Sequence, residues 1–380
     1  MLARSRDAPP TVAGGRLGRI RALLLVVVLV LIALLPARAQ ANQDLEFRTI
    51  DTEHFIIHYP VGTEEVADRV AMLAERAYDR LTLALAHEPR LRTHIIITDT
   101  TDAANGFANA VPFPRIRLFT SSPANLSVLG SYDDWLDILV THEFTHVVHI
   151  DTVHGLPKLL NALLGFGVLG KLSGPNIVQP RWIIEGLATM EESDLSSQGR
   201  YRSALFDMFL RMAVLEGRFQ PIDQFNSNAR VFPHGSSVYL YGLHFMHYLG
   251  MHYGRDKLAE LSHTYGKRLV PWGINRALED VIGVDFDQAF EEFQSDSELR
   301  FFAQARQIRA RGLRQGRRLT FTSASASSGQ HTRYPVWSPD DQWLWFYEDT
   351  GQRQAGLRRI PAEGSRIREG LQIGNQGQSP

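Results

Sequence analysis

Strand-like hydrophobic patterns surround one long helical pattern in the first third of the chain. Residues 64–85 carry apolar side chains at helical spacing, whereas the neighbouring stretches are short and rich in β-branched residues. The predicted strands are residues 45–59 (one or two strands), 93–100 and 114–122. Because prolines precede the last of them, we expect residues 115–119 to form an edge strand.

From residue 138 to residue 304 the hydrophobic pattern is mainly helical. Ser131 and Asp134 form a capping-box signal ahead of an apolar helix that carries residues 138–150. Five further helices are predicted, with Gly and Pro at their boundaries: residues 181–193, 201–217, 236–254, 256–266 and 286–304. This order predicts an α+β fold with a small β-rich N-terminal lobe and a helical C-terminal lobe.

The helical pattern stops at an arginine-rich stretch. Residues 306–318 hold six arginines and two glycines, and we interpret them as a solvated linker in preference to a binding patch. Beyond it, aromatic residues alternate from Trp343 to Tyr347, and an acidic turn leads to a second alternating run, which is typical of a hairpin. The predicted domains are therefore residues 40–305 and 319–380, the latter ending in a polar tail.

The first 39 residues have the pattern of a secretory signal. Arginines precede an apolar run from Ala22 to Leu35, and residues 37–39 form a small-x-small cleavage site. The apolar run is shorter than the roughly twenty residues needed to span a bilayer. An uncleaved membrane anchor is the alternative. We expect residues 1–39 to be removed and the mature protein to be periplasmic or extracellular.

Charge and cysteine content narrow the possible functions. Residues 1–39 hold six arginines and one aspartate, so their removal changes the formal net charge from −1 to −6. A chain of this charge does not favour nucleic acid as a general partner. The sequence has no cysteine, which excludes disulfides and leaves histidine and carboxylate side chains as the ligands for any metal.

The segment HEFTH, residues 142–146, carries the clearest chemical signal. On a helix, His142 and His146 lie one turn apart, and their imidazoles leave the same face. Two such imidazoles are two of the three protein ligands of a catalytic zinc site, and Glu143 on the adjacent flank is placed to accept a proton from a water that the metal activates. The alternative is a structural helix whose histidines lie at a core boundary.

A zinc site of this type needs a third protein ligand, and Glu185 is the best candidate. It lies in a predicted helix at residues 182–192 and precedes the small residues Gly186 and Ala188, which permit this helix to lie close against the HEFTH helix. An ordinary glutamate of an amphipathic helix is the alternative.

HEFTH followed by WIIEGLA resembles the gluzincin metallopeptidases. The resemblance is specific at these two motifs and implies a zincin-like fold with one zinc ion per chain. It implies that His142, His146 and Glu185 are the zinc ligands and that Glu143 is the general base and acid. Glu192 matches a family carboxylate that holds a metal-binding histidine through a hydrogen bond. Weaker candidates for such support are Glu191, Asp151 and His149.

Residues 236–249, SSVYLYGLHFMHYL, resemble the Tyr-x-x-Gly helix of the same family. The resemblance implies that Tyr239, three residues before Gly242, donates to the developing oxyanion. Tyr241 is the alternative, His234 is a further candidate donor, and a plain core aromatic residue also remains open.

The sequence departs from the family pattern in three places. The spacing between His146 and Glu185 is longer than the compact thermolysin-like spacing, and Ile184 replaces the asparagine that often precedes the third ligand. No Gly-x-Met-Glu-Asn-like stretch precedes the HEFTH helix. Because the family's exopeptidases use that stretch to hold the amino terminus of a substrate, the resemblance favours an endopeptidase.

The long spacing contains an apolar insertion at residues 156–172, whose charged residues are two lysines. A buried helical hairpin is the preferred interpretation. A lid over the cleft and a contact with a membrane surface are the alternatives.

The C-terminal segment PVWSPDDQWLWFYEDTGQ resembles the WSPDG repeats of TolB-type β-propellers, with Asp341 where glycine is usual. Propellers need about four to eight blades, and this chain offers the sequence of one partial blade. We therefore expect it to be the start of a longer protein. The propeller would restrict access to the peptidase or bind protein partners in the cell envelope.

These patterns together predict an exported zinc-dependent endopeptidase that acts on a protein or peptide substrate. A substrate strand would pair with the edge strand expected at residues 115–119. The alternative from another class is a non-catalytic envelope scaffold that uses the zincin fold and the propeller for partner recognition. A zinc hydrolase with a non-peptide substrate is a third possibility, because the same site polarises any carbonyl group.

Overall fold

The computed structural model describes residues 45–110, 113–123, 128–164, 174–226, 231–268, 272–314, 316–317, 319, 331–349, 356–363 and 368–369. The predicted secretory signal and polar tail lie outside these ranges. Among the helices within them, none combines the length and the apolar character that crossing a membrane requires.

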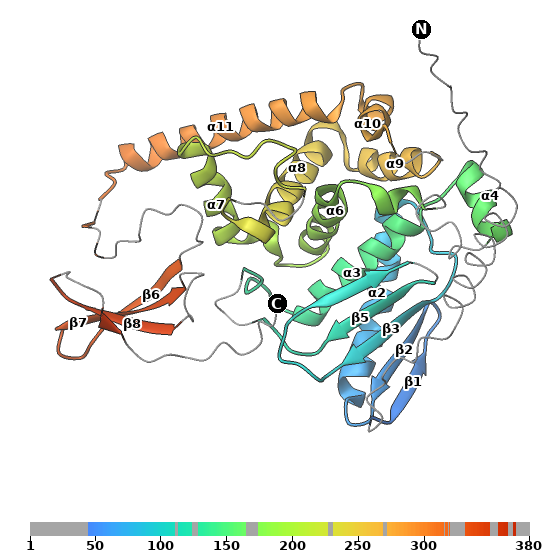
Figure 1. The fold of residues 1–380 in the computed structure, drawn as a ribbon, viewed down its shortest axis with the longest axis horizontal. Helices are drawn as coiled ribbons and strands as arrows, with labels where there is room; N and C mark the ends of the chain where they lie inside the picture. Colours follow the sequence, from blue (N-terminus) through green and yellow to red (C-terminus); the bar gives the residue numbers. More distant parts are fainter. Residues whose placement is uncertain are drawn as a thin grey trace, which may run out of the picture. The chain divides into compact units, whose positions relative to one another are not determined.

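A five-stranded mixed sheet forms the N-terminal part of the fold (Figure 1). Its strands are β1 (Phe47–Asp51), β2 (Phe55–Pro60), β3 (Thr93–Thr98), β4 (Gly106–Asn109) and β5 (Arg115–Phe119). The order across the sheet is β1-β2-β3-β5-β4. β2, β3 and β5 run parallel, whereas β1 and β4 pair antiparallel with β2 and β5. The strand predictions in this region are confirmed, and the first predicted stretch forms two strands.

The edge of this sheet differs from the prediction. Residues 115–119 form β5, which lies between β3 and β4, so the expectation of an edge strand there is wrong. β4, which the hydrophobic pattern did not indicate, occupies the edge and pairs with β5 as Gly106↔Leu118 and Ala108↔Ile116. Pro114 stands just outside β5 and contributes its carbonyl oxygen to the His94 N–H at 2.9 Å, so it does not interrupt the ladder.

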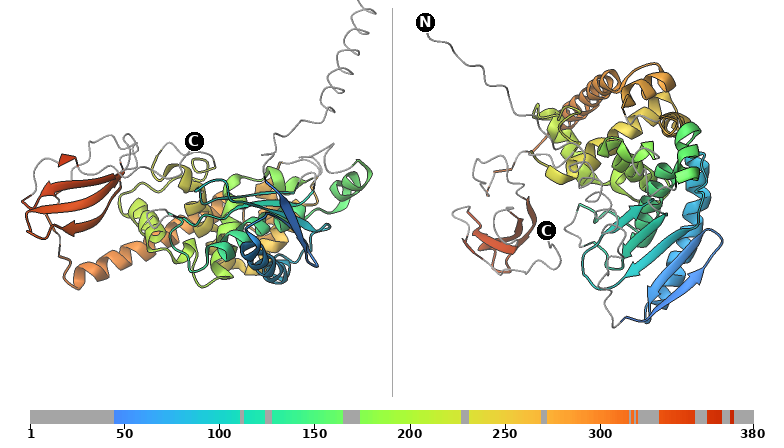
Figure 2. Two further views of the ribbon diagram at one scale, coloured as in Figure 1. Left: turned by 90° about the horizontal axis from the view of Figure 1, so that it is seen from below. Right: turned by 45° about the vertical axis from the view of Figure 1, so that its right-hand side comes forward.

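Helices α2 (Glu64–Leu85) and α3 (Trp135–Asp151) cover one face of the sheet (Figures 1 and 2). Strand side chains that point toward the helices are fully buried, among them Phe55, Ile95 and Ile116. Residues of alternate register, such as Arg115 and Arg117, are exposed. The alternation follows from the period of two along a strand, and it makes one face of the sheet core, while side chains on the other face are half-buried in β3 and exposed in β5.

The N-terminus of α3 is capped by Asp134. Its carboxylate accepts the N–H of Asp137 at 3.4 Å, and the helix begins at the next residue, Trp135. The capping box expected from Ser131 and Asp134 is therefore wrong, because the helix starts three residues later than a Ser131 cap would place it.

Helices dominate the chain after α3. They are α4 (Gly155–Leu164), α6 (Arg181–Asp194), α7 (Ala204–Leu215), α8 (Ser237–Tyr253), α9 (Arg255–Tyr265), α10 (Ile274–Ile282) and α11 (Phe286–Ala310), with 3-10 turns η1 (Pro175–Val178), η2 (Arg200–Arg202) and η3 (His234–Ser236). The five predicted helices are confirmed as α6, α7, α8, α9 and α11. α10 was not predicted, because its nine residues make only about two and a half turns. The chain therefore has a mixed α+β fold.

One predicted boundary and one predicted burial differ in the structure. α11 continues to Ala310, so the first five residues of the predicted linker are helical. In the insertion, α4 leaves Leu156, Leu159 and Leu163 exposed by 50%, 53% and 70%. The preferred interpretation of a buried hairpin is wrong for this described part of the insertion, and residues 165–172 lie outside the described residues.

A second, four-stranded antiparallel sheet follows in the order β6-β7-β8-β9. Its strands are β6 (His331–Trp337), β7 (Trp343–Asp349), β8 (Gly356–Pro361) and β9 (Arg368–Glu369). In the turn before β7, Ser338 Oγ accepts the Trp343 N–H at 2.9 Å, and Asp341 adopts a positive φ of 56°. The left-handed backbone at Asp341 explains why glycine suits this position of the repeat that the segment resembles.

Candidate metal centre

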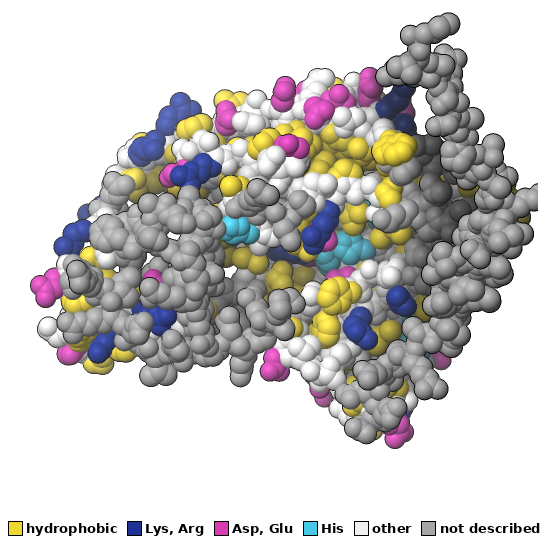
Figure 3. Space-filling model, in the orientation of Figure 1, with side chains coloured by type: hydrophobic (Ala, Val, Ile, Leu, Met, Phe, Trp, Pro, Cys, Tyr) yellow, Lys and Arg dark blue, Asp and Glu magenta, His cyan; other side chains and the backbone are white. Residues whose placement is uncertain are grey.

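The predicted site residues come together in one cavity, whose walls come from β4, α3, α6 and α8. They line a cavity of about 480 Å³, whose walls include His142, Glu143, His146, Glu185 and Tyr239. Figure 3 shows histidine side chains on the walls of a hollow in this face of the molecule, with acidic and basic side chains beside them. His142 and Tyr239, which are 97 positions apart in sequence, thus contribute to one cavity.

Three ligand atoms converge in this cavity. His142 Nε2 and His146 Nε2 lie 3.3 Å apart. Glu185 Oε2 lies 3.5 Å from the first nitrogen and 3.6 Å from the second. Within the described part of the chain, these three residues are the group of histidine and carboxylate side chains whose ligand atoms could hold a metal ion.

The size of this triangle suits a zinc ion. Zinc binds imidazole nitrogen and carboxylate oxygen at about 2.0–2.2 Å, and a tetrahedral ion with such bonds separates its ligand atoms by roughly 3.3–3.5 Å. The three distances are close to that edge length, and both imidazoles present Nε2 to the same point. An ion held by these three residues alone would keep one tetrahedral position for water or substrate.

Glu192 supports the first histidine from behind. Its Oε2 accepts a hydrogen bond from His142 Nδ1 at 2.9 Å, which orients the imidazole with Nε2 toward the cavity. Burial alone would lower the pKa of His142, but the hydrogen bonds to Glu185 and Glu192 outweigh burial and raise the pKa to about 9. Glu192 therefore makes the hydrogen bond to His142 that the resemblance implies.

Arg200 is a residue of this centre that the sequence analysis missed. Its Nε and Nη2 donate to the two carboxylate oxygens of Glu192 at 2.8 and 2.7 Å, and both side chains are buried. Burial alone would raise the pKa of Glu192, but the charges and hydrogen bonds of Arg200 and His142 together outweigh burial and lower the pKa to about 2. The guanidinium carbon also lies 4.7 Å from the centre of the Tyr239 ring. An arginine in a short 3-10 turn carries no motif, so no sequence signal marked it.

The three weaker candidates for support of the metal ligands have other partners. Glu191 accepts hydrogen bonds from Arg255 at 3.0 Å, and Asp151 pairs with Arg90 at 2.8 Å. His149 is hydrogen-bonded to Ser262 and Gln179, both at 2.9 Å. These contacts hold secondary-structure elements together, so the three side chains have structural roles.

Glu143 lies beside the ligands and is 5% exposed. Burial raises its pKa, and the neighbouring charges of His142 and His146 oppose that effect. β4 approaches the carboxylate closely, because a Cβ atom added at Gly106 would lie 2.8 Å from Glu143 Oε1. The edge strand and the carboxylate therefore border the same space.

Tyr239 borders the cavity from α8, and the two alternatives to it do not. Arg181 contacts two residues of the site: its Nη2 lies 3.5 Å from the Tyr239 hydroxyl oxygen, and its Nε lies 3.4 Å from Glu185 Oε1. Tyr241 is 1% exposed in the core, where its hydroxyl accepts the N–H of Gln220. His234 belongs to η3 and is not among the described residues that line the cavity.

A glycine crossing places Tyr239 next to Glu185. A Cβ atom added at Gly186 of α6 would lie 2.5 Å from the carbonyl carbon of Gly242 of α8, so the two backbones are in contact. The sequence suggested that Gly186 permits close contact with the HEFTH helix. That prediction is wrong, because Gly186 faces α8. The crossing explains why position 242 of the Tyr-x-x-Gly segment is glycine, because a larger residue would keep the two helices apart.

Comparison with known proteins provides one relative and no family. No protein-family model matches the chain. A protein of Treponema pallidum (strain Nichols), named "Uncharacterized protein", is 29% identical over 217 residues, which is 56% of this chain and 18% of the relative. The chain thus spans less than a fifth of the length of the curated relative that it matches.

Proposed function

We propose that this chain is an exported zinc-dependent metallopeptidase of the gluzincin type that cleaves peptide bonds within protein substrates. The observation that carries the proposal is the convergence of His142 Nε2, His146 Nε2 and Glu185 Oε2 at 3.3–3.6 Å beside the buried Glu143. When bound, a zinc ion would supply a Lewis acid that lowers the pKa of a water and polarises the carbonyl group under attack.

The side chains around the ligands would carry the proton transfers and charge stabilisation. Glu143 accepts the proton of the attacking water and later delivers it to the leaving amine. Tyr239 donates a hydrogen bond from its hydroxyl to the carbonyl oxygen on which negative charge develops. Arg181, 3.5 Å from that hydroxyl, adds positive charge on the same side. Glu192 and Arg200 keep His142 in the orientation that directs Nε2 to the cavity.

The edge strand would hold the substrate. β4 lies at the edge of the sheet and borders Glu143 through Gly106. An extended substrate segment that adds to β4 would place its main chain along the cavity, with affinity from backbone hydrogen bonds and little demand on sequence. This assignment replaces the segment 115–119 that the sequence suggested for the same role.

We further propose that the second sheet is one blade of a TolB-type propeller. Its four antiparallel strands match the number in one propeller blade. The Ser338 turn and the left-handed Asp341 support the resemblance of this segment to WSPDG repeats. A propeller beside the peptidase would control access to the site or bind envelope proteins.

The zinc content of the purified full chain tests the proposal. After reconstitution and dialysis, elemental analysis should find one zinc ion per chain in the wild type and in Glu279→Ala, which removes an exposed carboxylate of α10. Glu185→Ala should lose the ion or hold it far more weakly. Absence of zinc from the wild type would reject the metal centre and favour the non-catalytic scaffold.

Hydrolysis separates the peptidase from a zinc-binding scaffold. The wild-type chain should digest unfolded casein, and Glu143→Gln should abolish digestion while one zinc ion per chain remains bound. Undiminished digestion by a clean preparation of Glu143→Gln would refute the role of this carboxylate. A zinc-loaded wild type that cleaves no polypeptide would favour the scaffold or a non-peptide substrate.

A further inference from the structure

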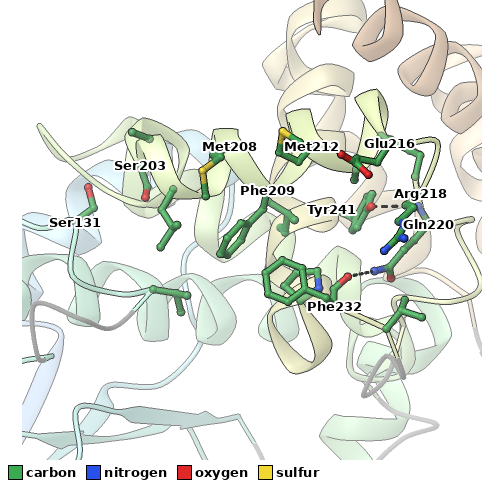
Figure 4. A pocket seen from close by; sticks show the side chains of 18 of the residues that line it. Ser131, Ser203, Met208, Phe209, Met212, Glu216, Arg218, Gln220, Phe232 and Tyr241 are labelled. Carbon is green, nitrogen blue, oxygen red and sulfur yellow. Dashed lines mark hydrogen bonds between the residues drawn. The ribbon is translucent and has the colours of Figure 1, made fainter. Parts of the chain in front are cut away.

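An apolar groove lies beside the candidate metal centre and has no role in the mechanism above. Figure 4 shows its side chains along α7, from Ser131 and Ser203 at one end to Arg218 and Gln220 at the other. The middle of the groove is lined by apolar side chains: Leu205, Met208, Phe209, Met212 and Leu240. A continuous apolar surface of this kind on a folded chain is a frequent sign of a binding site.

The groove adjoins the cavity of the metal centre. Val128 and Ser131 line both of them. At the start of α7, Ser203 and Leu205 face the groove, while Phe206 faces the cavity. A polypeptide held at the metal centre therefore lies next to the groove, with Val128 and Ser131 at the border between the two.

The dimensions and chemistry of the groove suit an extended polypeptide. α7 has twelve residues, which corresponds to about 18 Å at the helical rise of 1.5 Å per residue. An extended segment of about five residues covers that length at roughly 3.3 Å per residue. Met208 and Met212 stand one turn apart and are 38% and 41% exposed. Methionine side chains adapt to apolar partners of different shapes, so such a wall accepts many apolar sequences.

We propose that this groove binds an apolar segment of the substrate polypeptide next to the segment that lies at the metal centre. The inference rests on the proposed peptidase function and makes its substrate class narrower: unfolded or extended polypeptides with an apolar stretch on one side of the cleaved bond. Apolar stretches of this kind are buried in folded proteins, so the groove selects chains that have lost or not yet gained their fold.

Binding to the inactive full chain tests the groove without catalysis. Two fluorescein-labelled peptides share one core and differ in a five-residue tail, of leucine and alanine in one and of serine and asparagine in the other. Glu143→Gln protein should bind the apolar tail more tightly in fluorescence anisotropy, with zinc and with a chelator. Adding Met208→Gln and Met212→Gln, which preserve the length of both side chains, should weaken that binding about tenfold. Glutamine at Met72 and Met251, exposed by 60% and 71% on α2 and α8, is the matched control and should change nothing.

Digestion of unfolded casein provides the second measurement. Cleavage sites of the wild type should be enriched for apolar residues on one side of the bond, and the Met208→Gln/Met212→Gln chain should lose that enrichment while still cleaving. Cleavage with no such enrichment would refute the proposal that the groove binds apolar substrate segments, and so would equal binding of both tails. Either result would leave the peptidase proposal intact. Binding of the apolar tail without any cleavage would reject the peptidase and retain the groove as a polypeptide site. A wild-type dimer that the double variant dissociates in sedimentation would assign the groove to a second copy and overturn the proposal.

Discussion

A methyl group at Gly242 should force α8 away from α6 and disturb the candidate metal centre. The added Cβ atom would lie 3.1 Å from Gly186 Cα and closer still to the carbonyl oxygen of Trp182. Ordinary contacts between carbon atoms are about 3.5–4.0 Å. Because backbone atoms cannot rotate away as a side chain does, Gly242→Ala requires the helices to separate by roughly 1 Å.

Two opposing terms set the size of the effect. Overpacking of a close-packed interior costs about 1–3 kcal/mol, and collision with backbone places this site at the upper end. Alanine in place of glycine stabilises a helix by about 1 kcal/mol. The expected net loss is about 1–2 kcal/mol, which lowers Tm by about 1–3 °C in a protein of this size. A displacement of 1 Å at Tyr239 or Glu185 should reduce turnover on the order of a hundredfold.

Gly250 of the same helix provides the control. A Cβ atom there would meet Arg255 Cδ at 3.3 Å and Leu258 Cδ1 at 3.4 Å, which are ends of side chains that can move. Gly250→Ala should therefore match the wild type or exceed it by up to about 1 kcal/mol. Thermal unfolding, zinc content and casein digestion are measured on both variants. If Gly242→Ala equals Gly250→Ala in all three, the close crossing does not hold the site together.

Two further predictions concern buried ion pairs. Burial alone would raise the pKa of Asp151, but His87 and Arg90 outweigh burial and lower this pKa. The ionised Asp151 therefore stabilises the fold fully above its unfolded pKa of about 3.9. This stabilisation is lost as the pH falls through the lower pKa of the folded state. Asp151→Asn should cost about 2–4 kcal/mol in urea unfolding at pH 7 and progressively less toward pH 3; a constant difference would contradict this. Glu192→Gln should weaken zinc retention about 10–100-fold, and it should destabilise the zinc-free fold because Arg200 is left buried without a carboxylate. Adding Arg200→Met should restore the stability but not the zinc retention. Recovery of both properties would refute the role of Glu192 in holding His142.

The long elements were predictable from the sequence because their periodicity repeats many times. α2 and α11 each bury one stripe of side chains, and a helical stripe over three or more turns is readable without knowledge of the partner. α6 and α8 are buried on nearly all sides, and their length and apolar character marked them as helices. β4 and α10 were missed because four and nine residues contain too few repeats. The edge position of β4 depends on which strand pairs with β5, a property of the sheet and not of either segment.

The same distinction applies to the candidate site. His142, Glu143 and His146 lie within one helical turn, so the geometry of a single helix already brings their side chains together and the sequence was sufficient. The position of Glu185 within 3.6 Å of both imidazoles depends on how α6 packs against α3, and that of Tyr239 on the contact between Gly186 and Gly242.

Arg200 and the groove along α7 had no sequence signal at all. An arginine acquires a role when folding buries it against Glu192, since a buried carboxylate needs a partner and a solvated one does not. The apolar side chains of α7 fit an ordinary core helix in the sequence, and only the packed structure leaves Met208 and Met212 partly exposed. Local chemistry was thus set by short-range order along the chain, whereas the third ligand, its support and the adjoining groove were decided by contacts between segments far apart in sequence.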